Sequence, residues 1–583
     1  MTHIGRLLEG AVLLALLLLY ALLLRAYCVP VFQGVDANAY QVAARLFAEE
    51  GRFYKVPADE LSFVGPMWVA NDRGEYYPKY PPFYPALSGV ARKLFGTYES
   101  LYLNPAAAVL VVLGLYVLGR LWGLGPMALI VACFLALNPV FNFYAINQVS
   151  HIASMFCIVW GYVAFFLAAR KRPSLFVVSG LLLGYAAGIR YTDVLAALPA
   201  ALLSLRDWRA HGRKNAALFV SGLALPCLVI AYYDWRAFGS PWLTGYALTG
   251  EQSGFSMEAL IDNARFYIVA LMTSGLGPLF VISLMGCAVV CWRRAGDGLF
   301  FVLWIVPLTI LYMAYYWAPE TQPDSFLRFL LPVFIPALLL AGIFLANLRR
   351  HLGGARSVAA ALVIVITGTQ LVWGASESLR ALEIESDRQR RDQRTVLFVM
   401  RQVPPPATIF AGTSILNFLD FVGGYELYGA ELLDRAMLER ITGEALAPGL
   451  TGLQRQRAAT LRAQLIDGGA GLYHERIEHL ISSHLQRQQP VFLVVGRSAA
   501  TRFANEYDRR FASELVAELP PSPHRFRILP PCKWATFRTT AQLQAARQPE
   551  IQMLRLRPAD PAAKPAQGEL ELPARPPLSG RCR

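Results

Sequence analysis

The sequence predicts an α-helical polytopic membrane protein that carries a water-exposed α/β domain after its last membrane span. The first observation is composition: of 583 residues, 55% are hydrophobic and 16% are charged, against about 25% charged in an average soluble protein. The second is distribution, because the long apolar runs end near Gly374 and an ordinary polar composition follows. Runs of about 20 apolar residues are what a helix needs to cross a hydrocarbon core of about 30 Å.

About eleven apolar segments are long enough to be membrane helices. The fifth and sixth are short, and Arg190-Tyr191-Thr192-Asp193 lies between them. One long kinked helix would place Arg190 and Asp193 in the middle of the bilayer, where charges are costly, so we favour two short helices. The predicted spans are Leu7–Tyr27, Leu101–Leu121, Met127–Ile146, Ile152–Ala169, Leu175–Gly188, Val194–Leu205, Ala216–Tyr233, Leu276–Trp292, Leu299–Tyr316, Phe329–Leu345 and Val358–Trp373.

Charge predicts the orientation of these spans. With the fifth and sixth counted separately, four basic loops fall on the side of the N-terminus, and basic loops are typical of the cytoplasmic side. The loop 31–100 and everything after Trp373 then face outward. The Ala-, Arg- and Leu-rich composition favours a bacterial cytoplasmic (inner) membrane with a periplasmic C-terminal domain. The basic loops are 170–172, 206–214, 293–294 and 349–356.

The net charge of +14 raises the question of a nucleic-acid partner. The basic cytoplasmic loops already account for part of this charge, and the sequence contains no nucleic-acid-binding motif. We therefore expect no nucleic-acid partner.

The chain divides into a membrane domain, 1–374, an outward α/β domain, 375–546, and a Pro/Ala-rich tail, 547–583, that is predicted to be disordered. Cys532 and Cys582 both face outward, and a disulfide between them is left open. The α/β prediction rests on strand patterns at 408–412 and 490–496 and on helix patterns at 387–401, 432–446 and 453–465.

Asp36 lies a few residues beyond the first span, at the start of the loop 31–100. A carboxylate at the membrane interface can act as a general base when an acceptor's proton lies within reach. The alternative is that Asp36 caps a helix running from Ala37 to Glu49, because aspartate is a favoured N-cap residue. Asn38 adds an amide that can orient a sugar hydroxyl.

An aromatic and proline-rich segment, Tyr76–Leu87, leads the chain back to the membrane. Its tyrosines, Tyr80 among them, are typical of the interfacial belt of membrane proteins. Lys79 within this belt can pair with a lipid phosphate, or its amine can simply extend to the surface.

Three further residues are predicted near the outer face. His151 begins the fourth span, where polar residues indicate either a lined cavity or an ordinary helix start. Arg190 and Arg328 stand where arginine is statistically disfavoured, so each needs an anionic partner, and Asp193, Asp324 or a phosphate can serve.

In order along the chain, these motifs resemble the GT-C superfamily of integral-membrane glycosyltransferases, above all the protein O-mannosyltransferases and the lipid A aminoarabinose transferases. The resemblance covers roughly residues 7–345. It is carried by Asp36 and by the following motifs: AARLFAEEGRF (43–53), YPPFYPAL (80–87), Asn138-Pro139 through His151, GLLLGYAAGIR (180–190) and RFLLP (328–332).

The resemblance implies a polyprenyl-phosphate-linked sugar as donor and an inverting transfer to an acceptor hydroxyl. Asp36 would be the catalytic base. The candidate substrate-binding residues are Asn38, Lys79, Tyr80, His151, Arg190 and Arg328, with Lys79, Arg190 and Arg328 facing the donor phosphate and Arg265 a weaker candidate for it. The acceptor is left open among a glycan, a lipid and a protein, and membrane lipids surround the spans.

Two departures from the family pattern stand out. Many members have an acidic pair in the first loop where this chain has Asp36-Ala37, and the lysine before the proline pair lies one residue further back here. No outward cluster resembles an Asp/Glu metal site, so we expect metal-independent transfer without a cofactor.

Two other functions are left open. A lipid or polysaccharide transporter or flippase would have inverted repeats and polar groups at mid-membrane, and neither is seen in the sequence. A catalytically silent membrane scaffold is the third possibility, and the altered Asp36-Ala37 motif keeps it open.

Overall fold

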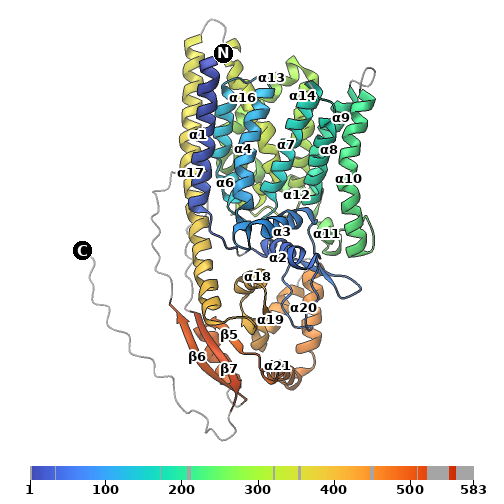
Figure 1. Cartoon of the computed structure of the whole chain (residues 1–583), viewed down its shortest axis with the longest axis vertical. Helices are drawn as coiled ribbons and strands as arrows, with labels where there is room; N and C mark the ends of the chain where they lie inside the picture. The colour runs from blue at the N-terminus through green and yellow to red at the C-terminus, as the bar shows by residue number, and fades with distance from the viewer. Residues whose placement is uncertain are drawn as a thin grey trace, which may run out of the picture.

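The computed structural model of the chain describes residues 3–32, 34–170, 172–206, 212–319, 322–351, 356–446, 452–507, 510–520 and 551–559. Cys532 and Cys582 lie outside these ranges. Figure 1 shows three levels along the long axis: a bundle of apolar helices, a layer formed by the first loop, and a C-terminal domain at the end opposite the N-terminus.

Within the described residues, seven helices are long and apolar enough to cross a membrane, or up to nine if two bent pairs each count as one span. Two shorter apolar helical segments, Leu175–Ile189 and Tyr191–Ser204, stand where the fifth and sixth spans were predicted. The membrane-protein class is thus confirmed, and the count of eleven is not. The long helices are α1 (His3–Tyr27), α4 (Leu103–Leu121), α7 (His151–Arg170), α10 (Arg213–Phe238), α14 (Ala295–Met313), α16 (Leu331–His351) and α17 (Arg356–Gln402).

The predicted span Met127–Ile146 is a bent pair rather than one straight helix. Helices α5 (Met127–Ala136) and α6 (Pro139–Ala145) meet at 61°. Pro139 cannot donate a backbone hydrogen bond, which ends the first helix and suits the start of the second. The Asn138 side chain accepts a hydrogen bond from the Phe141 amide at 2.9 Å and so caps α6.

The segment between α10 and the next predicted span, Leu276–Trp292, also contains helices. Helix α12 (Met257–Ala270) runs through η5 (Leu271–Gly275) and turns by 112° into α13 (Pro278–Arg293). Gly277 at the turn has a φ of 61°, which glycine adopts without strain. The remaining elements of this region are α8 (Leu175–Ile189), η2 (Tyr191–Ala197), α9 (Leu198–Arg206), α11 (Gly245–Leu248), η4 (Glu251–Gly254), α15 (Pro323–Leu327) and η6 (Arg328–Leu330).

The first loop folds into two packed helices and a small hairpin. Helix α2 (Val35–Glu50) packs closely on α3 (Phe83–Phe95), where a side chain at Gly89 would come within 2.8 Å of the Ala44 carbonyl oxygen. Between the helices, strands β1 (Trp68–Ala70) and β2 (Tyr76–Pro78) pair antiparallel, and η1 (Glu99–Tyr102) leads into α4.

Helix α17 joins the membrane bundle to the C-terminal domain without interruption (Figure 1). The sequence predicts a span ending at Trp373, a separate charged helix from 387 and a domain boundary at 374. The structure differs because the connecting residues contain no proline and are mostly good helix formers. Gly374 lies against the neighbouring helix pair, where a side chain would come within 2.7 Å of the Leu137 carbonyl oxygen.

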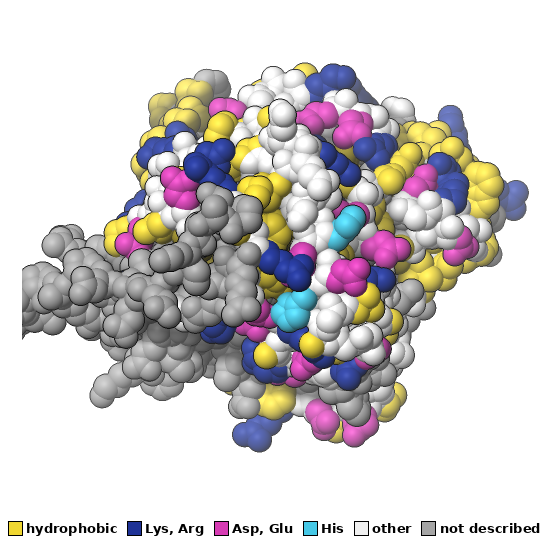
Figure 2. Space-filling view, turned by 90° about the horizontal axis from the view of Figure 1, so that it is seen from below, with side chains coloured by type: hydrophobic (Ala, Val, Ile, Leu, Met, Phe, Trp, Pro, Cys, Tyr) yellow, Lys and Arg dark blue, Asp and Glu magenta, His cyan; other side chains and the backbone are white. Residues whose placement is uncertain are grey.

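The C-terminal domain is α/β, as predicted, and contains a five-stranded mixed sheet of order β4-β3-β5-β7-β6. The predicted strands at 408–412 and 490–496 correspond to β3 (Ala407–Ala411) and β5 (Val491–Gly496), which are parallel. Figure 2, which views this end, shows basic and acidic side chains intermixed, as on a solvated surface. The other elements are β4 (Tyr425–Gly429), β6 (Phe511–Leu519), α18 (Thr413–Val422), η7 (Ala430–Leu433), α19 (Arg435–Leu446), α20 (Gly452–Leu465), α21 (Gly469–Gln486) and α22 (Arg497–Tyr507).

Strand β7 (Ile551–Pro558) corrects the prediction that the disordered tail begins at residue 547. It pairs antiparallel with both β5 and β6 and so lies inside the sheet. The side chains of Ile551, Met553, Leu554 and Leu556 are buried, and this apolar content within a Pro/Ala-rich stretch was the missed signal. The rest of the predicted tail lies outside the described residues.

The C-terminal domain is attached to the first loop by buried polar contacts. Asp420 of α18 forms an ion pair with Lys55, and it accepts a hydrogen bond from the Asn38 amide at 3.1 Å. The Phe63 amide donates to the Leu427 carbonyl of β4 at 2.7 Å. The loop and the domain therefore pack as one unit beneath the helix bundle.

We expect Asp420→Ala to loosen this attachment. The substitution leaves the largely buried Lys55 ammonium without its carboxylate, and breaking a buried pair from one side costs about 3 kcal/mol or more. Thermal unfolding in detergent and limited proteolysis between the loop and the domain measure the effect. Glu444→Ala is the matched control, because Glu444 is an exposed α19 carboxylate paired only within its helix. Equal behaviour of both variants would contradict the attachment.

Candidate functional site

A cavity of about 910 Å³ lies where the first loop meets the ends of the membrane helices. It is lined by residues from α2, the segment after β2, the start of α7, η2, the α10–α12 connection, the end of α14, α15 and α17. The cavity brings together six of the seven predicted site residues, and Asn38 is the exception: Asp36, Lys79, Tyr80, His151, Arg190 and Arg328.

Asp36 lies in the first turn of α2 and faces the cavity. The N-cap of that helix is Gly34, and no side chain caps it, so the interpretation of Asp36 as a helix cap is wrong. Its carboxylate instead accepts a hydrogen bond from the Tyr80 hydroxyl at 2.7 Å and pairs with the Arg328 guanidinium at 3.2 Å. Asp36 is therefore held by two cavity residues that lie far from it in the sequence.

These neighbours keep the Asp36 carboxyl ionised. Burial by itself raises its pKa. The charges of Arg328 and Lys79, with hydrogen bonds from Tyr80 and Arg328, outweigh burial, so the pKa lies below its ordinary value. The group is a carboxylate at neutral pH, as a proton acceptor must be.

Arg190 and Arg328 lie on neighbouring walls of the cavity. Arg190 directly follows α8, where it pairs with Asp193 at 3.4 Å and donates to the Tyr312 hydroxyl at 2.7 Å. Both guanidinium groups lie over the Phe329 ring, at 5.5 Å for Arg190 and 4.9 Å for Arg328. The predicted partner Asp193 is thus confirmed for Arg190, whereas Arg328 pairs with Asp36.

Lys79 has a buried partner that the sequence analysis missed. Its ammonium lies 2.5 Å from a carboxylate oxygen of Glu251, in η4, and it lies over the Tyr80 and Tyr246 rings. A single glutamate in a loop gives no sequence signal that would link it to a lysine 172 positions earlier. Each of the three cavity cations is therefore paired with a carboxylate: Arg328 with Asp36, Lys79 with Glu251, and Arg190 with Asp193, which is buried behind the cavity lining.

Stacked tyrosines fix the position of Tyr80. Its ring stacks on Tyr40 with centroids 4.4 Å apart, and Tyr40 in turn packs edge-on against Tyr84. Tyr40 is one helical turn after Asp36 and therefore shares its face of α2. The tyrosines of the proline-rich segment, predicted as an interfacial belt, are in part a wall of the cavity.

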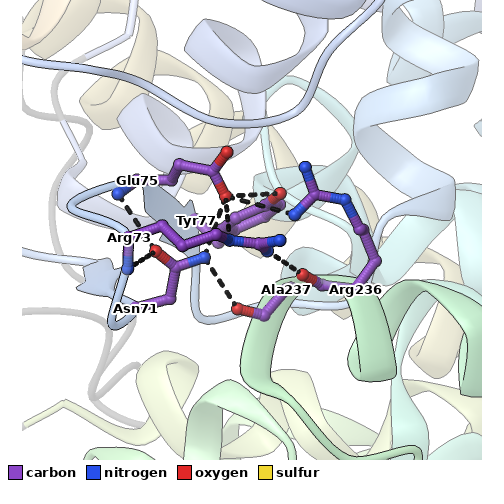
Figure 3. Close-up of polar contacts among 6 residues, drawn as sticks. All are labelled: Asn71, Arg73, Glu75, Tyr77, Arg236 and Ala237. Carbon is purple, nitrogen blue, oxygen red and sulfur yellow. Dashed lines mark hydrogen bonds and ion pairs between the residues drawn. The ribbon is translucent and has the colours of Figure 1, made fainter.

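The hairpin that precedes Lys79 and Tyr80 is clamped to the end of α10 (Figure 3). The Glu75 carboxylate pairs with Arg73 at 3.1 Å and with Arg236 of α10 at 3.3 Å. The Asn71 amide donates both to Glu75, at 2.9 Å, and to the Ala237 carbonyl, at 3.2 Å. Strand β2 thus enters the cavity wall from a fixed point.

We expect Glu75→Gln to release the hairpin. Both arginines are about half exposed, so solvent screens the pairs and the loss of stability is about 1 kcal/mol. Hydrogen exchange over residues 68–78 should rise, while the rest of the bundle keeps its protection. Asp72→Asn, an exposed acidic neighbour in the same turn, is the control. Unchanged exchange in Glu75→Gln would show that the remaining contacts, including the Asn71–Ala237 hydrogen bond, hold the hairpin without the Glu75 carboxylate.

Asn38 does not reach the cavity. It is fully buried on the other side of α2, where its amide donates to the Asn417 carbonyl and to Asp420, both at 3.1 Å, and accepts from the Trp68 indole at 3.0 Å. The structural reason is helical geometry, because side chains two positions apart point to opposite faces. Asn38 serves the attachment of the C-terminal domain.

Other residues complete the description of the site. Arg265 is exposed on α12 and does not line the cavity. In the part of the chain that the structure describes, no group of three or more His, Cys, Asp or Glu residues is arranged to hold a metal ion. A polar strip of α17, not predicted from the sequence, also lines the cavity: Glu385, Arg388, Gln389 and Asp392.

Comparison with known proteins gives one family match and several structural likenesses. The sequence model of Glycosyltransferase family 87 matches residues 79–314, a region that includes Lys79, Tyr80, His151 and Arg190. No curated protein matches the chain by sequence.

Among solved structures, ArnT from Cupriavidus metallidurans in the apo state is similar at 10% identity and a TM-score of 0.51, over 94% of this chain and 97% of that one. The archaeal oligosaccharyltransferase AglB from Archaeoglobus fulgidus, in complex with an inhibitory peptide and a dolichol-phosphate, is 14% identical over 83% of this chain and 69% of its own, with a TM-score of 0.49. Arabinofuranosyltransferase AftD from Mycobacteria is 12% identical over 93% and 39%, with a TM-score of 0.48. The likeness to ArnT shows a shared fold.

Proposed function

From a chain with the GT-C glycosyltransferase fold, we infer an enzyme that moves a sugar from a polyprenyl-phosphate-linked donor to an acceptor hydroxyl. One observation carries this inference: an ionised carboxylate, Asp36, lies in the same cavity as Lys79, Arg190 and Arg328. Such a transfer needs a proton acceptor beside the acceptor hydroxyl and positive charge beside the departing phosphate.

The three cations suit a phosphate leaving group. Each is paired with a carboxylate, which balances its charge before the donor enters. The Nε atom of Arg328 is buried without a hydrogen-bond partner, and arginine N–H groups match phosphate oxygens in geometry and charge. As the bond from the sugar to the phosphate breaks, these groups stabilise the negative charge that develops.

Asp36 is proposed as the general base. It would take the proton of the acceptor hydroxyl while the hydroxyl oxygen attacks the anomeric carbon, and the pair of electrons in the sugar–phosphate bond would leave with the phosphate. A single displacement of this kind inverts the anomeric centre. A carboxylate has about four lone-pair positions, so the bonds from Tyr80 and Arg328 leave room for the acceptor.

The proposed location is the outer face of a bacterial cytoplasmic membrane. The cavity lies at the end of the bundle that carries the C-terminal domain (Figure 1), and the basic loops predict that the other end is cytoplasmic. A sugar that reacts at this face is best supplied on a lipid phosphate, because the leaving group then stays in the membrane. The acceptor is a hydroxyl-bearing glycan, lipid or protein.

The test is transfer by purified wild-type protein from a panel of radiolabelled undecaprenyl-phosphate sugars. We expect release of the sugar from at least one donor, and inhibition of that release by added undecaprenyl phosphate. If no donor is turned over and undecaprenyl phosphate does not bind, the enzyme proposal fails, and a transporter or a silent scaffold becomes the better account.

A further inference from the structure

Buried polar atoms without hydrogen-bond partners gather around the cavity. Native proteins leave few such atoms unsatisfied, and each calls for an explanation such as a missing ligand. Among the described residues that line the cavity, side chains with such atoms include Gln148 (Oε1), His151 (both ring nitrogens), Ser325 (Oγ) and Arg328 (Nε).

His151 and Gln148 are the most deeply buried members of this set. His151 is 5% exposed and Gln148 is 1% exposed. The His151 ring lies between those of Tyr144, at 5.2 Å, and Phe329, at 6.0 Å. The side-chain amide nitrogen of Gln148 donates to the Leu101 carbonyl at 2.6 Å. The unpaired atom of Gln148 is therefore its side-chain oxygen, which is an acceptor.

The kinds of atom left unpaired distinguish two parts of a ligand. The Arg328 Nε–H group is a donor and suits a phosphate oxygen. A phosphodiester has no hydrogen to donate, so it cannot satisfy the Gln148 oxygen, nor the acceptor nitrogen of a neutral imidazole. A hydroxyl group both donates and accepts, and it meets the needs of both side chains.

We propose that His151 and Gln148 form a subsite that binds hydroxyl groups of the transferred sugar, next to the phosphate held by the arginines. This rests on the proposed function and deepens it, since it assigns the residues that select the sugar. His151 is then a specificity-determining residue, and the unsatisfied atoms are a cost to the empty protein that the sugar removes.

The experiment compares binding of undecaprenyl phosphate with binding of undecaprenyl-phosphate glucose, mannose and arabinose to wild type and to His151→Phe. We expect wild type to bind one sugar lipid at least tenfold more tightly than the bare phosphate lipid. His151→Phe, which keeps a ring but has no polar atom, should lose that preference while its affinity for undecaprenyl phosphate stays unchanged. Its Tm should be unchanged or higher, because a buried unsatisfied group has been removed.

Two further variants separate a role in binding from a structural role. His151→Asn and His151→Gln each place an amide, which can both donate and accept a hydrogen bond, where the imidazole was, and should recover part of the preference for the sugar lipid. His479→Phe, at an exposed position on α21, should behave as wild type.

Three results would overturn the proposal. If His151→Phe loses affinity for both lipids equally, His151 contacts the phosphate and not the sugar. If its Tm falls and its affinity for both lipids falls with it, the role of His151 is structural. If wild type shows no preference for any sugar lipid over undecaprenyl phosphate, there is no sugar subsite. If wild type binds neither lipid, the proposed function itself is contradicted.

Discussion

Asp36→Asn should reduce the rate of sugar transfer by a factor of about 10² to 10⁴, the usual contribution of a general base. The asparagine side chain has nearly the same shape, and its oxygen can still accept a hydrogen bond from Tyr80 or Arg328. It cannot take up the acceptor's proton, so kcat should fall while the affinity for undecaprenyl phosphate is kept. Single-turnover transfer of a radiolabelled sugar measures the loss.

The control for this variant is Asp262→Asn, which makes the same substitution at an exposed position of α12 and should keep full activity. Thermal unfolding of both proteins shows whether the fold is intact. Turnover by a folded Asp36→Asn protein at the wild-type rate would remove Asp36 as the base and direct attention to the other carboxylates that line the cavity, Glu251 and Asp324 among them.

Arg328→Gln should have the second-largest effect, because this residue has two partners in the proposed reaction. Loss of one well-placed cation or donor at a developing negative charge lowers kcat by about 10² to 10³. The affinity for undecaprenyl phosphate should fall as well, which separates this variant from Asp36→Asn. Arg328→Lys keeps the charge and loses the planar fork, so it should recover part of the binding. Unchanged affinity in Arg328→Gln would show that the phosphate binds elsewhere.

The same variant predicts a change in pH dependence. The Arg328 charge is the largest of the influences that lower the pKa of Asp36, so removing it lets that pKa rise. The base is then protonated at a higher pH, and the acid limb of the kcat/KM profile should move to higher pH. In wild type, the lowered pKa stabilises the fold above the ordinary aspartate pKa, and this stabilisation disappears as the pH falls through the lowered value. Arg328→Gln should therefore lose less stability on acidification.

Much of the membrane fold could be predicted from hydropathy and charge, because the physical requirement on each membrane span depends only on its own residues. An apolar run of sufficient length must be a helix in the bilayer, whatever surrounds it. The bend between α12 and α13 and the continuity of α17 across Gly374 depend on neighbouring helices, and a single sequence does not contain that information. Strand β7 was missed because its partners, β5 and β6, are needed to bury it.

The site was predictable where a residue was out of place for its surroundings. Arg190 and Arg328 stood out as arginines at the face where they are disfavoured, and Asp36 as a carboxylate directly after a span. Glu251 did not stand out, because a glutamate in a polar loop is ordinary until Lys79 lies against it. Asn38 was assigned by proximity in sequence to Asp36, and the 200° between alternate helix positions placed it on the opposite side.

Helix α17 is one continuous helix that connects the membrane bundle to the C-terminal domain. With 47 residues and a rise of 1.5 Å per residue it is about 70 Å long, more than twice the thickness of a hydrocarbon core. Gln389 of this helix lines the cavity. Its side chain donates to the Ile146 carbonyl at 3.1 Å and accepts from the Val29 amide at 3.3 Å. Because one continuous helix carries both the connection to the C-terminal domain and part of the cavity lining, a tilt of that domain would move the cavity wall with it.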